Sequence, residues 1–291
     1  MRLAVVARLD RDLGRKIAAM VAKSAKSAGF SRVTVTDVTP PLDSVDVVFV
    51  HGIVERAVFD NCRAAGLPVV IVDKGYNRVP RGPLKCWYWR MSVNAPQPLA
   101  YMARGRPGDR WRATGGRIPR GPARLGKSII FAGSSQKYCD WFALGDANAY
   151  AAEVLAGAAK AMPGAPLVYR PKPSWRGAEA VPGAALDDGS GSRVTLQAAM
   201  RSCRCVVTHG SNATFEALLA GYPAVTLGPG LASAIGVNTV ADVRTARWPG
   251  AAAVTTLAYD AAYHQWTVAE FETGYAVRQA LEYVEVCSRG R

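Results

Sequence analysis

A polar turn between two apolar segments is the stretch of this sequence best suited to binding an anion. Residues 205–208 are typical of a buried strand, a His-Gly-Ser-Asn turn occupies residues 209–212, and residues 213–219 have a helical pattern. The first N–H groups of a helix lack internal partners and lie at the positive end of its dipole, so they attract phosphate. The turn is therefore expected to hold a phosphate, and Glu216 to bind ribose hydroxyls. The alternative is a capped helix with a surface glutamate. The turn residues are His209, Gly210, Ser211 and Asn212.

Two further polar turns follow apolar segments in the same half of the chain. Ser134, Ser135 and Lys137 come after residues 128–132, while Arg170 and Lys172, each followed by proline, come after residues 167–169. Proline stiffens the backbone, so these two cations lose little conformational freedom on binding. Arginine grips phosphate oxygens through its planar fork, and lysine acts as a point charge. We expect these five residues to extend the site to a diphosphate.

Polar residues also end the strands expected in the N-terminal half. His51 follows residues 45–50, and Asp73 follows residues 68–72 with Lys74 beside it. An imidazole titrates near neutrality, and a carboxylate can take a hydroxyl proton that lies within hydrogen-bond reach. The candidate general bases are therefore Asp73 and His51, with ordinary loop polarity as the alternative for each, and Asp140 in the C-terminal half is a third candidate.

Basic residues are concentrated in the middle of the chain. The net charge is +14, and residues 74–124 hold two Lys and ten Arg against one acid, Asp109, a net +11. Such a block is typical of a surface that faces phosphates or of an arm without fixed structure. Within it, residues 85–94 interleave aromatic and basic side chains, which suits a platform for stacking bases or a strand with two tryptophans packed on one face. The expected DNA-binding residues are Lys74, Tyr76, Arg78, Arg81, Lys85, Trp87, Trp89, Arg90, Arg110 and Arg112.

The composition is that of a globular protein. Of the 291 residues 49% are hydrophobic, and no apolar run approaches the ~20 residues of a membrane span, so no membrane partner is expected. The first residues become charged too early for a signal peptide. The six cysteines and three histidines lack the spacing of metal ligands. These features predict a cytoplasmic protein with no metal site.

Apolar segments alternate with helical patterns, which predicts an α/β fold with two doubly wound, Rossmann-type domains. The expected strands are residues 3–9, 33–38, 45–50, 68–72, 85–94, 128–132, 167–169, 205–208 and 224–227. The expected helices are residues 12–28, 53–65, 146–162, 195–202, 213–219 and 258–286, the last interrupted near Gly274. The expected domains are an acceptor domain (1–105), a basic linker or loop (106–126), a donor domain (127–257) and a C-terminal helix (258–291) that crosses back to the first domain.

Several short motifs occur in one order along the chain. They are Asp73-Lys74-Gly75-Tyr76, Arg90-Met91-Ser92-Val93-Asn94, Lys137-Tyr138-Cys139-Asp140-Trp141, Arg170-Pro171-Lys172-Pro173, His209-Gly210-Ser211-Asn212-Ala213 with Glu216, and Gln265-Trp266-Thr267 with Glu270 and Gly274. This ordered set resembles the GT-B glycosyltransferase-like proteins of tailed bacteriophages, which are distantly similar to capsule polysaccharide transferases. The resemblance covers most of the chain in patches. It implies a GT-B-like fold whose two domains face a cleft, with a nucleotide sugar (a UDP-sugar) as donor, no bound cofactor and no metal requirement.

The resemblance also implies an acceptor. Relatives of this kind are implicated in glycosylating 5-hydroxymethylated pyrimidines in phage DNA, which places the reaction in the cytoplasm of an infected bacterium. The basic block favours the same acceptor, because DNA carries one phosphate charge per ~1.7 Å of axis. A base within a duplex must be flipped out to be modified. The alternatives are a capsule-type polysaccharide transferase and a non-catalytic DNA-binding protein with a degenerate GT-B fold.

Overall fold

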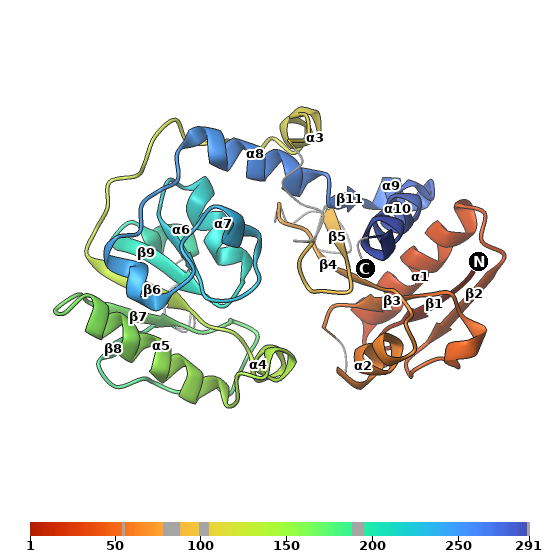
Figure 1. Ribbon diagram of the computed structural model, residues 1–291, viewed down its shortest axis with the longest axis horizontal. Helices are drawn as coiled ribbons and strands as arrows, with labels where there is room; N and C mark the ends of the chain where they lie inside the picture. The colour runs from red at the N-terminus through yellow and green to blue at the C-terminus, as the bar shows by residue number, and fades with distance from the viewer. Residues whose placement is uncertain (54–55, 78–87, 99–104, 188–194, 290–291) are drawn as a thin grey trace. The chain divides into compact units, whose positions relative to one another are not determined.

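The computed structural model describes residues 1–53, 56–77, 88–98, 105–187 and 195–289. The chain forms two compact units (Figure 1). The first contains residues 1–114 and 260–291, and the second contains residues 115–259. The expected basic linker is therefore split between the units. Residues 109–113 of this segment form a helix that buries Trp111 in the first unit, because removing a large indole ring from water is favourable.

The first unit is built on a six-stranded sheet of order β11-β5-β4-β3-β1-β2. Strands β1 to β4 are parallel, β5 is antiparallel to β4, and β11 is antiparallel to β5. The elements are β1 (Arg2–Val6), α1 (Asp12–Ser27), β2 (Arg32–Thr36), η1 (Leu42–Ser44), β3 (Val47–His51), α2 (Arg56–Ala64), β4 (Val69–Lys74), β5 (Tyr88–Val93), α3 (Asp109–Ala113), β11 (Gln265–Thr267), α9 (Val268–Glu272) and α10 (Tyr275–Arg289).

Helices cover both faces of this sheet. Figure 1 shows α1, α9 and α10 on one face and α2 on the other. The alternation of side chains along a strand divides the core in the same way: Val5, Phe49 and Val72 pack with Ile17 of α1 and Val277 of α10 in one cluster. The layers therefore match the expected doubly wound arrangement.

The second unit is built on a parallel five-stranded sheet of order β10-β9-β6-β7-β8. Helix α5 packs on one face, and α6 and α7 pack on the other. The elements are β6 (Ser128–Ala132), α4 (Gln136–Phe142), α5 (Ala147–Ala161), β7 (Leu167–Arg170), β8 (Ala184–Leu186), α6 (Leu196–Met200), β9 (Cys203–Thr208), α7 (Asn212–Leu219), β10 (Ala224–Thr226), η3 (Leu231–Ala234), η4 (Val240–Arg244) and α8 (Ala251–Ala262), whose last residues belong to the first unit.

The expected helix over residues 258–286 is wrong in its first half, whereas its expected interruption near Gly274 is present. The structure replaces it with the end of α8, strand β11 and two helices, α9 and α10. Thr267 and Glu270 form a reciprocal capping box that starts α9, so the chain is extended just before it. Gln265 and Trp266 pair with Arg90 and Trp89 in the ladder between β11 and β5.

A glycine fixes the corner between α9 and α10. Gly274 has φ 77°, and a Cβ there would lie 2.6 Å from the backbone nitrogen of Ala28. We expect Gly274→Ala to lower the free energy of unfolding by about 2 kcal/mol or more, measured by urea denaturation. Gly29→Ala is the matched control, because Gly29 has φ 97° with nothing within 4 Å of its Cβ position. Equal losses in the two variants would contradict the steric part of this prediction.

Candidate functional site

The carboxyl ends of the strands in the second unit meet at one edge of its sheet. The chain runs from β6 outward to β7 and β8, and then returns to β9 on the other side of β6. The strand order therefore reverses between β6 and β9, and ligands of such sheets bind outside the carboxyl ends at this reversal. Ser134 and Ser135 follow β6, and residues 209–212 follow β9, so the structure brings these two turns to neighbouring positions.

The turn after β9 is held by its own hydrogen bonds. Ser211 lies at the N-cap of α7, where its Oγ accepts from the backbone N–H of Ala213 at 3.3 Å. The N–H of Ser211 donates to Oγ1 of Thr208 at 3.1 Å. Gly210 has φ 84°, a conformation that side chains disfavour, and a Cβ there would meet the carbonyl oxygen of Pro229. The turn after β10 thus rests directly on the turn after β9.

His209 supports these turns rather than reaching outward. Its side chain is buried, and Nδ1 lies 2.7 Å from the hydroxyl of Tyr150. The hydroxyl of Tyr138 in α4 donates to the His209 carbonyl oxygen at 2.6 Å. The ring also lies against the backbone of Gly228, where a Cβ would clash with Nε2. Neighbouring aromatic side chains enclose the ring, so any part of His209 in donor binding, which stays a prediction, would involve its backbone.

Burial lowers the pKa of His209 below its ordinary value of 6.5, since the charged imidazolium is poorly solvated there. The unfolded chain then binds more protons than the folded one below about pH 6.5, so stability falls as the pH drops from 6.5 toward the lowered pKa. We expect the free energy of unfolding to decline more steeply between pH 7.5 and 5.5 in the wild type than in His209→Asn. Urea titrations at several pH values measure both slopes. Equal slopes would contradict the assignment.

The two cations after β7 differ in their surroundings. The Arg170 guanidinium is largely buried and forms an ion pair with Asp187, which follows β8. Lys172 is exposed two residues further on. Both lie at the carboxyl edge of the sheet, as expected. The pairing with Asp187 fixes the orientation of Arg170, and the sequence alone did not indicate that partner.

The remaining donor candidates lie on α4 and α7. Lys137 and Asp140 are exposed on α4, and Asp140 accepts from Nε2 of Gln136 at 2.8 Å. Glu216 is half-buried on α7, with Nε2 of Gln197 at 3.5 Å from its carboxylate. Asn212 is buried at the first residue of α7, and its Oδ1 has no hydrogen-bond partner among the described residues.

In the first unit, two candidate bases lie at adjacent strand ends. His51 ends β3 and pairs in register with Val72 of the neighbouring parallel strand β4, directly before Asp73. The Asp73 carboxylate accepts from the backbone N–H of Lys74 at 2.7 Å and from Nη2 of Arg90 at 3.1 Å. It keeps 37% of its side chain exposed. Asp140 lies in the other unit, so the structure groups two of the three candidates.

Three expected DNA contacts are instead internal. Trp89 is completely buried in the core, and Tyr76 and Arg90 are also buried. Nη1 of Arg90 donates to Oε1 of Gln97 at 2.7 Å, and the Tyr76 hydroxyl donates to the same oxygen at 3.2 Å. Burial opposes the charge of Arg90, but Asp73 and Tyr76 raise its pKa above the ordinary value. A base cannot stack on Trp89, because the sheet and its helices cover that ring.

Arg110 is also engaged within the first unit. Its guanidinium donates to Glu270 at 2.6 Å and to the carbonyl oxygens of Gln265 and Ala262. It therefore ties α3 to the C-terminal segment and is unavailable as the expected DNA contact. Lys74 and Arg112 are exposed. The expected contacts Arg78, Arg81, Lys85 and Trp87 lie outside the described residues.

Gln265 is a structural residue whose role the sequence did not indicate. Its side chain is fully buried, and Oε1 accepts from the backbone N–H groups of Tyr76 and Asn77 at 2.8 and 3.2 Å. Nε2 donates to Oδ1 of Asn77 at 3.0 Å. Gln265 therefore fixes the segment directly after Asp73 and Lys74. A glutamine carries no spacing signal, so only the three-dimensional contact identifies this role.

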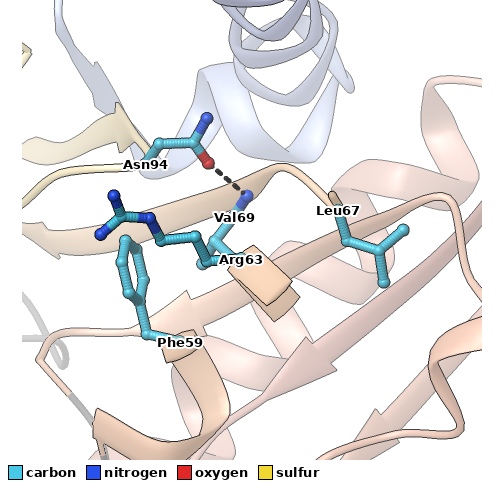
Figure 2. Close-up of a pocket in the computed structure, with 5 residues that line it drawn as sticks. All are labelled: Phe59, Arg63, Leu67, Val69 and Asn94. Carbon is cyan, nitrogen blue, oxygen red and sulfur yellow. Dashed lines mark hydrogen bonds between the residues drawn. The ribbon is translucent and has the colours of Figure 1, made fainter. Parts of the chain in front are cut away.

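A pocket of about 240 Å³ lies at the edge of the first sheet opposite to Asp73 and His51. It is lined by Phe59, Arg63, Leu67, Val69 and Asn94 (Figure 2). Oδ1 of Asn94 accepts from the N–H of Val69 at the start of β4. Because Asp73 lies near the other end of that strand, the pocket is separate from the candidate bases.

Among residues 1–53, 56–77, 88–98, 105–187 and 195–289, no three His, Cys, Asp or Glu side chains gather as a metal site would require. The closely spaced Asp10 and Asp12 are paired with basic neighbours. No helix in the described part of the chain is long and apolar enough to cross a bilayer.

No protein-family model and no curated protein matches this chain. Among solved structures, the chain is similar to KpsC from Thermosulfurimonas dismutans, described as a beta Kdo 2,4 transferase, with a TM-score of 0.57 and 14% identity over 96% of this chain and 98% of that one. A second KpsC structure from that organism, a beta Kdo 2,7 transferase, has a TM-score of 0.49 and 14% identity over 96% and 100%. The glycosyltransferase SnogD from Streptomyces nogalater has a TM-score of 0.31 and 14% identity over 98% and 100%. The chain has a GT-B-like α/β fold with two Rossmann-like units.

Proposed function

We propose that this GT-B-like chain is a glycosyltransferase that uses a nucleotide-sugar donor. One observation carries the proposal: the turns after β6 and β9 flank the reversal of strand order in the second unit. The Tyr138 hydroxyl, on the helix that follows the first turn, donates to the His209 carbonyl oxygen in the second turn and so connects the two. The N-terminus of α7 lies at that point with Ser211 as its cap. A helix end at a strand reversal is suited to a nucleotide diphosphate.

The donor contacts follow from this placement. The positive end of the α7 dipole and the cations Arg170 and Lys172 stabilise the diphosphate as it leaves, and Glu216 binds the ribose. The acceptor oxygen bonds to the anomeric carbon of the sugar, and the bond from that carbon to the diphosphate oxygen breaks with its electron pair going to the diphosphate. The proton of the acceptor hydroxyl passes to Asp73, beside which His51 lies. Asp73 is preferred because Arg90 and the Lys74 N–H orient its carboxylate.

For the acceptor, we propose the hydroxymethyl group of a modified pyrimidine in DNA. The net charge of +14 supports a polyanionic acceptor. The exposed Lys74 lies next to Asp73, where it can meet a phosphate near the reacting hydroxyl. The base is flipped out of the duplex, since its hydroxymethyl group is otherwise inaccessible to a carboxylate. A UDP-sugar is the donor proposed first.

A second candidate is a capsule-type transfer to a polysaccharide. The likeness to the KpsC transferase along nearly the whole chain favours this reading, although it rests on fold alone. The two candidates share the donor site and differ in the acceptor. Transfer to an uncharged carbohydrate would leave the excess of basic residues without a role in the reaction.

Mass spectrometry of nucleosides separates the candidates. DNA containing 5-hydroxymethyluracil or 5-hydroxymethylcytosine is incubated with the protein and a panel of UDP-, GDP- and CMP-sugars. A hexose- or pentose-sized mass gain on one base is the expected result. Donor turnover only when an oligosaccharide acceptor is present would replace the DNA proposal with the capsule-type one. No turnover of any donor with either acceptor would overturn the enzyme proposal.

A further inference from the structure

We infer that the second unit carries a basic face that docks the phosphate backbone of a nucleic acid, at the sheet edge opposite the donor turns. The face consists of Arg124, Lys127, Arg201, Arg204, Arg244 and Arg247. Five of these six side chains are exposed, and Arg204 is half-buried. The inference deepens the proposed function, on which it rests in taking DNA as the polyanion.

The placement of the face follows from strand order and backbone contacts. Lys127 directly precedes β6, and Ser202 directly precedes β9. The N–H of Lys127 donates to the Ser202 carbonyl oxygen at 3.0 Å. Parallel strands start at one edge, so Lys127 and Arg201 lie at the amino edge of the sheet. Arg124 lies at the same edge, because Ala123 beside it donates to the Gly221 carbonyl just before β10.

Backbone carbonyl oxygens bring the other three cations, Arg204, Arg244 and Arg247, close together. Nη2 of Arg204 donates to the Arg244 carbonyl at 2.8 Å and lies 3.4 Å from the Ala246 carbonyl. Nη1 of Arg247 donates to the same Ala246 oxygen at 3.1 Å. Two like-charged guanidinium groups therefore converge on one oxygen. Each keeps further N–H donors, since a guanidinium carries five.

Carboxylates do not neutralise this face in the part of the chain that the structure describes. None of the six cations forms an ion pair there, whereas Arg2, Arg90 and Arg110 in the first unit each have an acidic partner. Asp242 is the acid nearest in sequence, and its carboxylate accepts from Oγ1 of Thr239. Among the other acids of this unit, Asp146 caps the start of α5 and Asp187 directly follows β8.

The chemistry of the face favours phosphates over a lipid surface. Five of the six cations are arginines, whose planar forks bind phosphate oxygens in pairs. Binding to a membrane surface also buries apolar side chains. Among the described residues next in sequence to the six cations, only Leu125 is a large exposed hydrophobic residue, with 36% exposure. A regular polyanion with accessible phosphates therefore fits better than a bilayer.

The test compares two variants with the same net charge of +10 instead of +14. The face variant is Arg124→Gln, Lys127→Gln, Arg201→Gln and Arg244→Gln, chosen because the structure gives these side chains no hydrogen bond among the described residues. The control is Lys26→Gln, Arg32→Gln, Arg63→Gln and Arg176→Gln, which are exposed cations elsewhere. Fluorescence anisotropy measures the affinity of each protein for a DNA duplex of about 20 base pairs over a series of KCl concentrations.

We expect the slope of log K against log[KCl] to become shallower by about 2 to 4 in the face variant, with affinity falling roughly 100-fold at 0.1 M KCl. The control should keep the wild-type slope. Equal weakening in both variants, or a wild type without salt-dependent DNA binding, would overturn the inference. So would a face variant that loses only its binding to phosphatidylglycerol vesicles. A protein that shows the expected DNA binding without any sugar transfer would refute the proposed function and leave this inference standing.

Discussion

Replacing Asp73 with asparagine should lower kcat for sugar transfer about 1,000-fold, within the range for loss of a general base. In the proposed reaction the carboxylate takes the proton of the acceptor hydroxyl, which an amide of nearly the same shape cannot do. The Michaelis constant for the donor should change little, because the proposed donor contacts lie in the second unit. Steady-state kinetics with varied donor and fixed acceptor separate these two quantities.

A matched control distinguishes a chemical role for Asp73 from a structural one. Asp10→Asn changes an exposed carboxylate near the end of β1, at the same edge of the sheet, and should leave kcat within about twofold. Asp73→Asn also removes the partner of the buried Arg90, so its free energy of unfolding must be measured alongside. If Asp73→Asn is folded and transfers sugar at the wild-type rate, Asp73 is not the base.

Local patterns in the sequence were sufficient for the elements that carry the candidate site. Strand β6 has the residues expected of it, and α7 begins one residue before its expected start. A buried parallel strand is a continuous apolar run with a clear end, and a polar turn followed by helical periodicity is equally local. The positions of Ser134, Lys172 and Glu216 relative to their strands follow from such patterns.

Side-chain direction depended on contacts that are distant in sequence. The His209 ring turns inward, where it meets the hydroxyl of Tyr150, 59 residues away, and packs against the ring of Tyr138, 71 residues away. Strand β5 could expose its aromatic residues or bury them, and packing against Trp266 and the helices α9 and α10 buried Trp89. Charge counting failed for a related reason. Arg90 and Arg110 belong to the basic block in sequence, but each is held by an acid of its own unit.

The C-terminal segment shows how a local signal can be outweighed. Residues 258–286 were expected to form one helix interrupted near Gly274. The Thr267 and Glu270 pair marks a helix start within that segment, and it was the decisive local feature. The extended conformation of Gln265 just before it is stabilised by the distant amides of Tyr76 and Asn77.

Replacing Glu216 with alanine should lower kcat/KM for the donor at least 100-fold, while the affinity for DNA stays within about twofold. A carboxylate that accepts two ribose hydroxyls contributes charge-assisted hydrogen bonds of about 1.5–3 kcal/mol each, and alanine removes both. Glu216 lies on α7, whose start belongs to the proposed donor turn, whereas the basic face lies at the opposite sheet edge. Steady-state kinetics with varied donor measure kcat/KM. Isothermal titration with the nucleotide diphosphate and anisotropy with a DNA duplex measure the affinities for the nucleotide and for DNA separately.

The control for Glu216 is Glu153→Ala, which removes an exposed carboxylate from α5 of the same unit and should leave both affinities unchanged. The comparison also tests the class of protein. An enzyme loses transfer and nucleotide binding together in Glu216→Ala and keeps its DNA affinity, because the two ligands bind different edges of one sheet. A non-catalytic DNA-binding protein with this fold has no use for the ribose contact. In that case Glu216→Ala and Glu153→Ala would be indistinguishable from the wild type in every assay.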